Sequence, residues 1–290
     1  VRTAQTTVLY ADMNGNGSDD VVYITPAGSV SYIELFPVRP NLMSRITNGI
    51  GLVTEVTYTS SVAEQARDGG ADSASWPHAL PNSMQVVKTI DTYAEQTVAE
   101  DVQHDLQVFT YAAGYYDGDE KQFRGYARVE EVNEGDETQQ SSLQLLEYEV
   151  GAEDPYRFGR ELRTVILGGQ PDGTWLPMVT RETVYQDCEV AGLERVDAQF
   201  PVRFICVSES REVVQEQAPE AEWKTLVTRS TYNGYGNATE MNALGVADVD
   251  GDEVYTEAEF IEPGAATGGR WIIGKAKRVV SYGDPATKAT

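Results

Sequence analysis

Hydrophobic and polar residues alternate along much of the chain. Between residues 254 and 260, alternate positions are held by Val254, Thr256, Ala258 and Phe260, with Tyr255, Glu257 and Glu259 between them. The same period of two recurs around Leu146 and around Val56. Successive side chains of a β-strand point to opposite faces of the sheet, so this pattern predicts strands with one buried and one solvated face.

Short dipeptides rich in glycine, asparagine and aspartate separate the predicted strands. Such pairs supply the positive φ that tight hairpin turns require. They are Asn14-Gly15, Asn48-Gly49, Asp117-Gly118, Gly168-Gly169, Asp172-Gly173, Asn233-Gly234, Gly236-Asn237, Asp250-Gly251 and Gly268-Gly269. Many strands joined by many hairpins predict an all-β fold of hairpin-built antiparallel sheets.

Helical spacing of apolar residues is scarce. The best candidate, at Ser61–Gln65, is short and soon reaches Gly69-Gly70. Glycine is a poor helix former, so no helix is expected there.

Three regions differ in composition. Residues 1–40 contain one loop rich in Asp, Asn and Gly and two predicted strands, and end at Pro37 and Pro40. Residues 41–150 form a strand-rich block with a polar interruption at residues 63–75, and residues 151–290 continue as further hairpins. The chain begins at Val1 without a signal peptide, so we expect a piece of a longer polypeptide, whose compartment this does not indicate.

Charge excludes several classes of partner. The chain has 46 acidic and 22 basic residues, a net charge of −24. It is therefore expected to repel nucleic acid and anionic lipid, and to stay soluble or bind divalent cations or a basic partner. No apolar run reaches the length of a transmembrane helix, so no membrane insertion by this segment is expected.

Two cysteines lie close together in the sequence. Cys188 and Cys206 flank a turn-like Ala191-Gly192, which suits a cross-strand disulfide and an oxidising compartment. Two buried free thiols are the alternative. A metal site at the cysteines is not expected, because His78 and His104 are the only histidines and neither is near them.

The most specific local signal is the segment ADMNGNGSDDVVYI. Asp12, Asn14, Asn16, Ser18 (through its backbone carbonyl) and Asp20 stand at relative positions 1, 3, 5, 7 and 9, followed directly by a predicted strand. Oxygens at this alternating spacing let a loop wrap a calcium ion. The segment resembles the calcium loop of FG-GAP or VCBS repeats in β-propellers, with Asn16 in place of an aspartate. The alternative is an Asx-rich turn without metal.

Other candidate chemistry favours structural interpretations. The acidic run with Asp248, Asp250 and Asp252 lacks the sixth-position glycine of an EF-hand, where Glu253 stands, and is interpreted as a solvated hairpin. No nucleophile elbow, phosphate loop or basic patch is present, so no catalytic residue and no enzyme activity are expected. One aromatic set is interpreted as sheet packing, with sugar binding as the alternative. Its members are Tyr111, Tyr115, Tyr116, Phe123 and Tyr126.

Three segments, residues 42–61, 80–93 and 110–130, resemble a known family. The most specific is the last, with Tyr116-Asp117-Gly118 followed by Phe123-Arg124-Gly125. Together they resemble the middle region of the B component of bacterial insecticidal toxin complexes and of SpvB-like proteins. Residues 230–242 and 270–280 resemble the Rhs or YD-repeat strands of the same proteins.

The resemblance implies an architecture and a function. Residues 1–40 would be an FG-GAP/VCBS-like propeller segment, the remnant of a propeller blade. Residues 41–150 would be the toxin-complex middle region, and residues 151–290 an Rhs/YD-repeat-like part of a cocoon-like β-shell. The secreted or surface-exposed parent would encapsulate a C-terminal toxic domain. Its partners would be other regions of the same polypeptide and a toxin-translocating protein.

The family motif is interpreted as structural. Gly118 and Gly125 are expected to allow positive φ or a close approach of strands, and Arg124 to pair with a carboxylate.

Two other functions remain open. One is a calcium-dependent surface adhesion or carbohydrate-binding β module, and the other is an enzyme whose site lies outside or hidden within this stretch.

Overall fold

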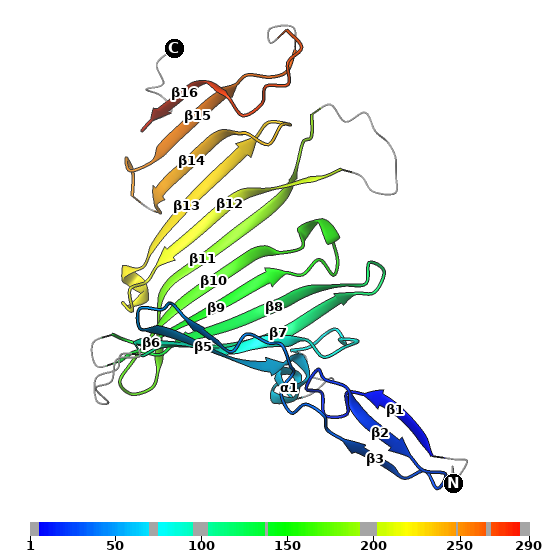
Figure 1. Cartoon of the computed structure of the whole chain (residues 1–290). Coiled ribbons are helices and arrows are strands. Elements are labelled where there is room, and N and C mark those ends of the chain that lie inside the picture. Colours follow the sequence, from blue (N-terminus) through cyan, green and yellow to red (C-terminus); the bar gives the residue numbers. More distant parts are fainter. Residues whose placement is uncertain are drawn as a thin grey trace. The chain divides into compact units, whose positions relative to one another are not determined.

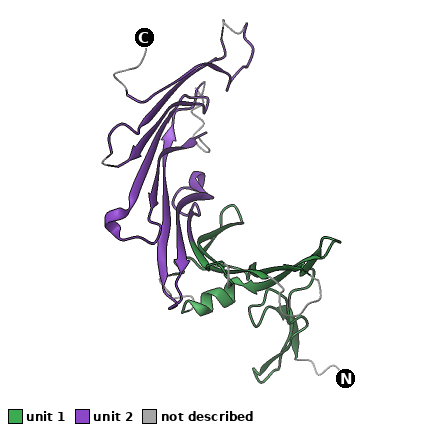
Figure 2. Ribbon diagram, turned by 90° about the vertical axis from the view of Figure 1, so that its left-hand side faces the viewer, with its two compact units in different colours: residues 1–144 green, residues 145–290 purple. Residues whose placement is uncertain are grey.

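The computed structural model describes residues 6–69, 75–94, 104–136, 139–191, 202–247, 249–264 and 268–284. Within them nearly all regular structure is β-strand, and the paired strands run antiparallel (Figure 1). The predicted all-β fold of hairpin-built sheets is therefore confirmed. The chain divides into two compact units, residues 1–144 and 145–290 (Figure 2). The predicted domain boundaries near residues 40 and 150 stay predictions.

Unit 1 begins with a three-stranded sheet, β1 (Thr7–Ala11), β2 (Asp20–Ile24) and β3 (Val30–Ile33). The register aligns Val8 with Tyr23 and, in the next row, Leu9 with Val22 and Tyr32. Adjacent rows face opposite sides of a sheet, so both faces of this small sheet are apolar.

The rest of unit 1 is a hairpin-connected sheet in chain order. Its strands are β4 (Arg45–Thr47), β5 (Leu52–Ser60), β6 (Gln85–Ala94), β7 (His104–Asp117) and β8 (Gln122–Asn133). One α-helix, α1 (Ser61–Arg67), follows β5 and lies against β5 and β7. Buried Val53, Val56, Trp76 and Tyr126 form much of the core of this unit.

The helix corrects the expectation that residues 61–65 stay non-helical. Ser60 caps the helix, because its hydroxyl accepts a hydrogen bond from Ala63 N at 3.2 Å. Ser61 and Glu64 are buried on one side. Tertiary contacts therefore stabilise a helix too short to form from its own propensity.

Unit 2 continues the same hairpin pattern. Strand β9 (Ser142–Glu149) lies at the boundary between the units. The other strands of unit 2 follow in chain order. They are β10 (Arg160–Gly169), β11 (Trp175–Cys188), β12 (Phe204–Val214), β13 (Lys224–Tyr232), β14 (Ala238–Val246), β15 (Val254–Phe260) and β16 (Ala276–Tyr282). Two 3-10 helices, η1 (Pro155–Arg157) and η2 (Glu220–Glu222), lie in its connections.

One predicted turn is wrong. Gly168 and Gly169 are not a turn but the last residues of β10, paired with Leu176 and Trp175. The turn itself lies further on and uses Gly173, whose φ is 83°. The turn predicted at Asp172-Gly173 is therefore confirmed, whereas the neighbouring two-glycine signal marks the end of a strand.

Candidate functional site

Of the five residues predicted to ligate calcium, four lie in the loop between β1 and β2, and Asp20 is the first residue of β2. Asp12 accepts hydrogen bonds from the backbone N–H groups of Asn16 at 3.0 Å and Gly17 at 2.8 Å. The side-chain oxygen of Asn16 accepts from Ser18 N at 2.8 Å. These contacts are those of an Asx-rich turn, in which side-chain oxygens satisfy the donors of their own loop.

Asp20 differs from the other loop residues. Its side chain is fully buried, and Oδ2 accepts a hydrogen bond from Met13 N at 3.1 Å. Oδ1 accepts none from the described residues, and the Ser18 hydroxyl is likewise buried without a partner. A buried carboxylate oxygen without a donor is costly, so an additional ligand would be favourable there.

The donor set of the loop fits a weak oxygen-ligand site in part. Asp12 and Asp20 supply carboxylates and Asn14 and Asn16 supply amide oxygens, the hard ligands that calcium prefers. No group of three or more His, Cys, Asp or Glu side chains in the described ranges is placed to hold a metal ion.

The described residues of the second acidic run lie in a hairpin. Asp248 lies outside the described residues. Asp252 Oδ2 accepts a hydrogen bond from Val246 N at 2.9 Å and so closes the β14–β15 hairpin.

The family motif forms the end of the β7–β8 hairpin. Asp117 Oδ1 accepts hydrogen bonds from Asp119 N at 3.0 Å and Glu120 N at 3.1 Å. Arg124 donates to Asp117 Oδ2 and to Glu120 Oε2, both at 3.1 Å. The hydrogen bond from Glu120 N, with the Arg124 guanidinium, lowers the pKa of Asp117 below its usual value.

The two glycines of the motif behave differently. Gly125 has φ of 102°, as expected for a position that favours glycine. Gly118 does not have positive φ, and a Cβ there would meet nothing within 4 Å, so its expected constraint is wrong. The left-handed residue of this turn is Lys121, with φ of 54°.

The aromatic residues of the same region mostly contact one another. Tyr126 is buried, and its ring centroid lies 5.1 Å from Tyr111 and 5.2 Å from Phe123. Trp76 meets the Tyr126 ring edge-on at 6.1 Å, and Gly114 leaves space for this contact. Burial raises the pKa of Tyr111 to about 12, as expected for a phenol in a packed core. These contacts favour packing over sugar binding for the set.

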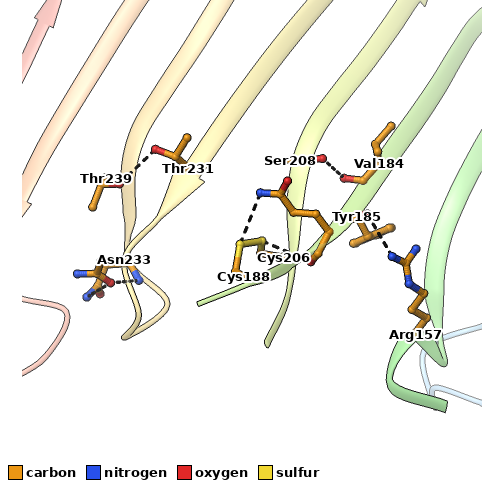
Figure 3. Close-up of a disulfide and its surroundings, with 11 residues drawn as sticks. Arg157, Val184, Tyr185, Cys188, Cys206, Ser208, Thr231, Asn233 and Thr239 are labelled. Carbon is orange, nitrogen blue, oxygen red and sulfur yellow. Dashed lines mark hydrogen bonds between the residues drawn. A yellow bond between two sulfur atoms is a disulfide. The ribbon is translucent and has the colours of Figure 1, made fainter. Parts of the chain in front are cut away.

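Cys188 and Cys206 are joined in the structure, on the neighbouring strands β11 and β12 (Figure 3). Their Cα atoms are 6.0 Å apart, within the usual range for a disulfide. The turn predicted at Ala191-Gly192 includes Gly192, which lies outside the described residues. Whether the pair is oxidised in the protein's own compartment stays a prediction.

An ionic cluster that the sequence did not indicate lies near the disulfide, where β11 ends and β12 begins. Arg203 donates to both oxygens of Asp154 at 2.9 Å and to Asp187 at 2.6 and 2.7 Å. Its guanidinium also lies 4.9 Å from the centre of the Tyr156 ring. The hydrogen bonds from Arg203 lower the pKa values of Asp154 and Asp187. Arg203 and Asp154 are 49 positions apart, so no local pattern could have paired them.

Comparison with known families decides the affiliation. The family described as the insecticide toxin TcdB middle/N-terminal region matches residues 1–148, about half of the 290-residue chain. The chain belongs to this family. The resemblance of the middle segments to toxin-complex B components is thereby confirmed. The search of curated proteins finds no match.

Solved toxin-complex structures share the fold of this TcdB-family chain. A Photorhabdus luminescens Tc holotoxin pore with a mutation in TccC3 matches at 16% identity and a TM-score of 0.75. That match covers 96% of this chain and 16% of the other. TcdB2-TccC3 gives the same identity and TM-score, with 96% and 17% covered. TcdB2-TccC3 without its hypervariable C-terminal region matches at 16% identity and 0.73, with the same coverage. The chain thus spans about a sixth of these proteins.

Proposed function

We propose that this chain is a wall segment of the shell of a larger secreted toxin-complex protein, and that it encloses a toxic domain without catalysing a reaction. Membership of the TcdB family carries the proposal. The solved relatives contain TcdB2 together with TccC3, so a TccC3-like region and a translocating protein are the proposed partners. No helix in the described ranges has the length and apolarity to cross a bilayer.

The side chains of unit 2 suit a single-layer wall with water on both sides. Arg181 and Glu182 are neighbours in β11 and so face opposite sides of the sheet. Arg181 pairs across the strands with Glu212 at 2.7 Å, and Glu182 with Arg163 at 3.4 Å. Each face therefore carries cross-strand ion pairs, and no residue of β13 or β14 is fully buried.

This pair of neighbours also gives a test. In the parent toxin freed of its native cysteines, Arg181→Cys and Glu182→Cys would each be labelled with a bulky, polymer-linked maleimide. A wall around a closed chamber predicts rapid labelling at one position and slow labelling at the other, with the difference abolished when the shell is opened by denaturant. Equal labelling rates in the folded toxin would contradict the proposal and favour an open adhesion module.

The small sheet β1–β3 supports a propeller segment at residues 1–40. Sheets apolar on both faces occur where other layers cover each face. Val8 and Tyr10 on one face, and Val30 and Tyr32 on the other, are exposed in this chain. Neighbouring blades of the parent polypeptide would bury them.

We further propose that the Asp12–Asp20 loop binds calcium weakly, with the buried Asp20 Oδ1 as the best-supported ligand atom. Titration calorimetry with calcium, and melting with and without chelator, would detect binding and the stability gain that it brings. Asp20→Asn is expected to abolish both effects. Asp19→Asn removes an adjacent exposed carboxylate and is the matched control. An Asp20→Asn protein that responds to calcium like the wild type would leave only a metal-free turn.

A further inference from the structure

Strand β7 loses one of its neighbours partway along its length. Its ladder with β6 runs from Tyr93↔His104 to Thr89↔Val108 and ends there. The β5–β6 register shifts at the next residue of β6, Lys88, and the start of β6 continues with β5 alone. Beyond Val108, β7 remains paired with β8 as far as Asp117. Among the described residues, no strand therefore pairs with its other edge from about residue 109 onward.

Two side chains of α1 take the place of a strand at this edge. The Tyr111 N–H donates to Glu64 Oε2 at 3.1 Å, and Arg67 Nη2 donates to the Tyr111 carbonyl at 3.4 Å. In an antiparallel ladder the N–H and C=O of one residue bond to the same neighbouring strand. The carboxylate and guanidinium thus replace the C=O and N–H that this strand would have supplied. They also bond to each other, and Glu64 is buried.

The same helix is attached to the β1–β2 loop. Ser61 exchanges hydrogen bonds with the backbone of Met84, at 2.8 and 2.9 Å. The residues on either side of Met84 bind the loop: Ser83 Oγ donates to the Gly15 carbonyl at 2.8 Å, and Gln85 Nε2 to the Asn16 carbonyl at 2.6 Å. Gly15 lies so close to Val62 of α1 that a Cβ on Gly15 would clash with that side chain.

We propose that α1 couples two sets of contacts. Through it, the docking of the Asp12–Asp20 loop and the closure of the β7 edge at Tyr111 stabilise each other. A helix of seven residues is not stable alone, so its folding depends on contacts at both ends. Loss of the loop contacts weakens α1, which exposes the Tyr111 N–H and C=O. Opening of the β7 edge loosens the loop in turn, because such coupling is reciprocal. The proposal does not depend on calcium.

Amide hydrogen exchange of the full chain, followed residue by residue by NMR, tests the coupling in both directions. Ser83→Ala combined with Gln85→Ala removes the two loop contacts and is expected to speed exchange at Tyr111 at least about tenfold. Glu64→Ala is expected to speed exchange at Gly17 and Ser18 by a comparable factor. Glu64→Gln keeps an acceptor for Tyr111 N and should have a smaller effect, so it serves if Glu64→Ala fails to fold.

Two references separate coupling from general loosening. The Val56 N–H, bonded to the Ser44 carbonyl at 2.9 Å, reports opening elsewhere in unit 1 and should keep its rate in the loop variant and in both Glu64 variants. Asn48→Ala, which breaks an unrelated turn, should change neither Tyr111 nor the loop. The proposal is overturned if the loop variant leaves Tyr111 unchanged, or if Val56 accelerates as much as Tyr111.

Discussion

The small sheet β1–β3 and the sheet of unit 2 are built alike from antiparallel hairpins, but their side chains differ. The small sheet is apolar on both faces, and Tyr10 and Ile33 are among its exposed side chains. The unit 2 sheet carries ion pairs on both faces and a covalent link between β11 and β12. The first exposes apolar side chains on both faces, whereas the second has faces that suit water. The comparison therefore matches the proposed interface in the small sheet and the proposed wall in unit 2.

The largest expected effect concerns the covalent link in unit 2. A disulfide closing a loop of this length stabilises by about 3 kcal/mol, mainly by restricting the unfolded chain. Reduction should therefore lower the free energy of unfolding of unit 2 by about that amount and leave hydrogen exchange in β1–β3 unchanged. Denaturant unfolding with and without reductant measures it. The Cys188→Ala, Cys206→Ala double variant should no longer respond to reductant, and free thiols in the untreated protein would refute the link.

The second effect is a loss of stability of unit 2 at low pH. Arg203 holds the pKa values of Asp154 and Asp187 below those of the unfolded chain, near 3.9. The unfolded state therefore binds more protons as the pH falls, so this stabilisation is present above about pH 4 and is lost below it. Arg203→Gln should melt at lower temperature than the wild type at pH 7, and the two should converge at low pH.

The matched control for this acid dependence is in unit 1. Arg124→Gln removes the corresponding arginine partner of Asp117. It should leave the pH dependence of the stability of unit 2 unchanged. If Arg203→Gln keeps the full wild-type acid sensitivity in unit 2, other carboxylates cause that sensitivity.

A third, smaller effect tests the polar faces of the wall. Arg181 and Glu212 are about half exposed, so a double-mutant cycle to alanine should give a coupling of about 0.2–1 kcal/mol. The coupling should shrink in 1 M salt, because exposed charges are screened. The pair Arg229–Glu209, at 2.9 Å, is the parallel case on the next strand pair. Couplings above this range that resist salt would indicate a drier face than a solvated wall would have.

How far the sequence predicts these features depends on the range of the interactions. Alternation alone predicted the strand at residues 254–260, and β15 has those bounds, because side-chain period is a local property. Helix α1 was missed, since its stability comes from Ser60 capping and from contacts with β7 and the β1–β2 loop. The Arg203 cluster was missed because Arg203 and Asp154 are far apart in the sequence. The family motif directed attention to Arg124, whose partners are only a few residues away.

The smallest effect in the isolated chain is the one that tests the interface most directly. Tyr10→Thr with Ile33→Thr keeps good strand formers but removes two exposed apolar side chains from one face of the small sheet. In this chain the free energy of unfolding should change by less than about 0.5 kcal/mol. In a longer stretch of the parent polypeptide that includes the proposed neighbouring blades, the same change should cost about 3–6 kcal/mol, because burial of each of the two side chains would contribute about 1.5–3 kcal/mol. Denaturant unfolding of both proteins gives the comparison. An equal, small cost in both would mean that no neighbour covers this face, and that its apolar character does not mark an interface.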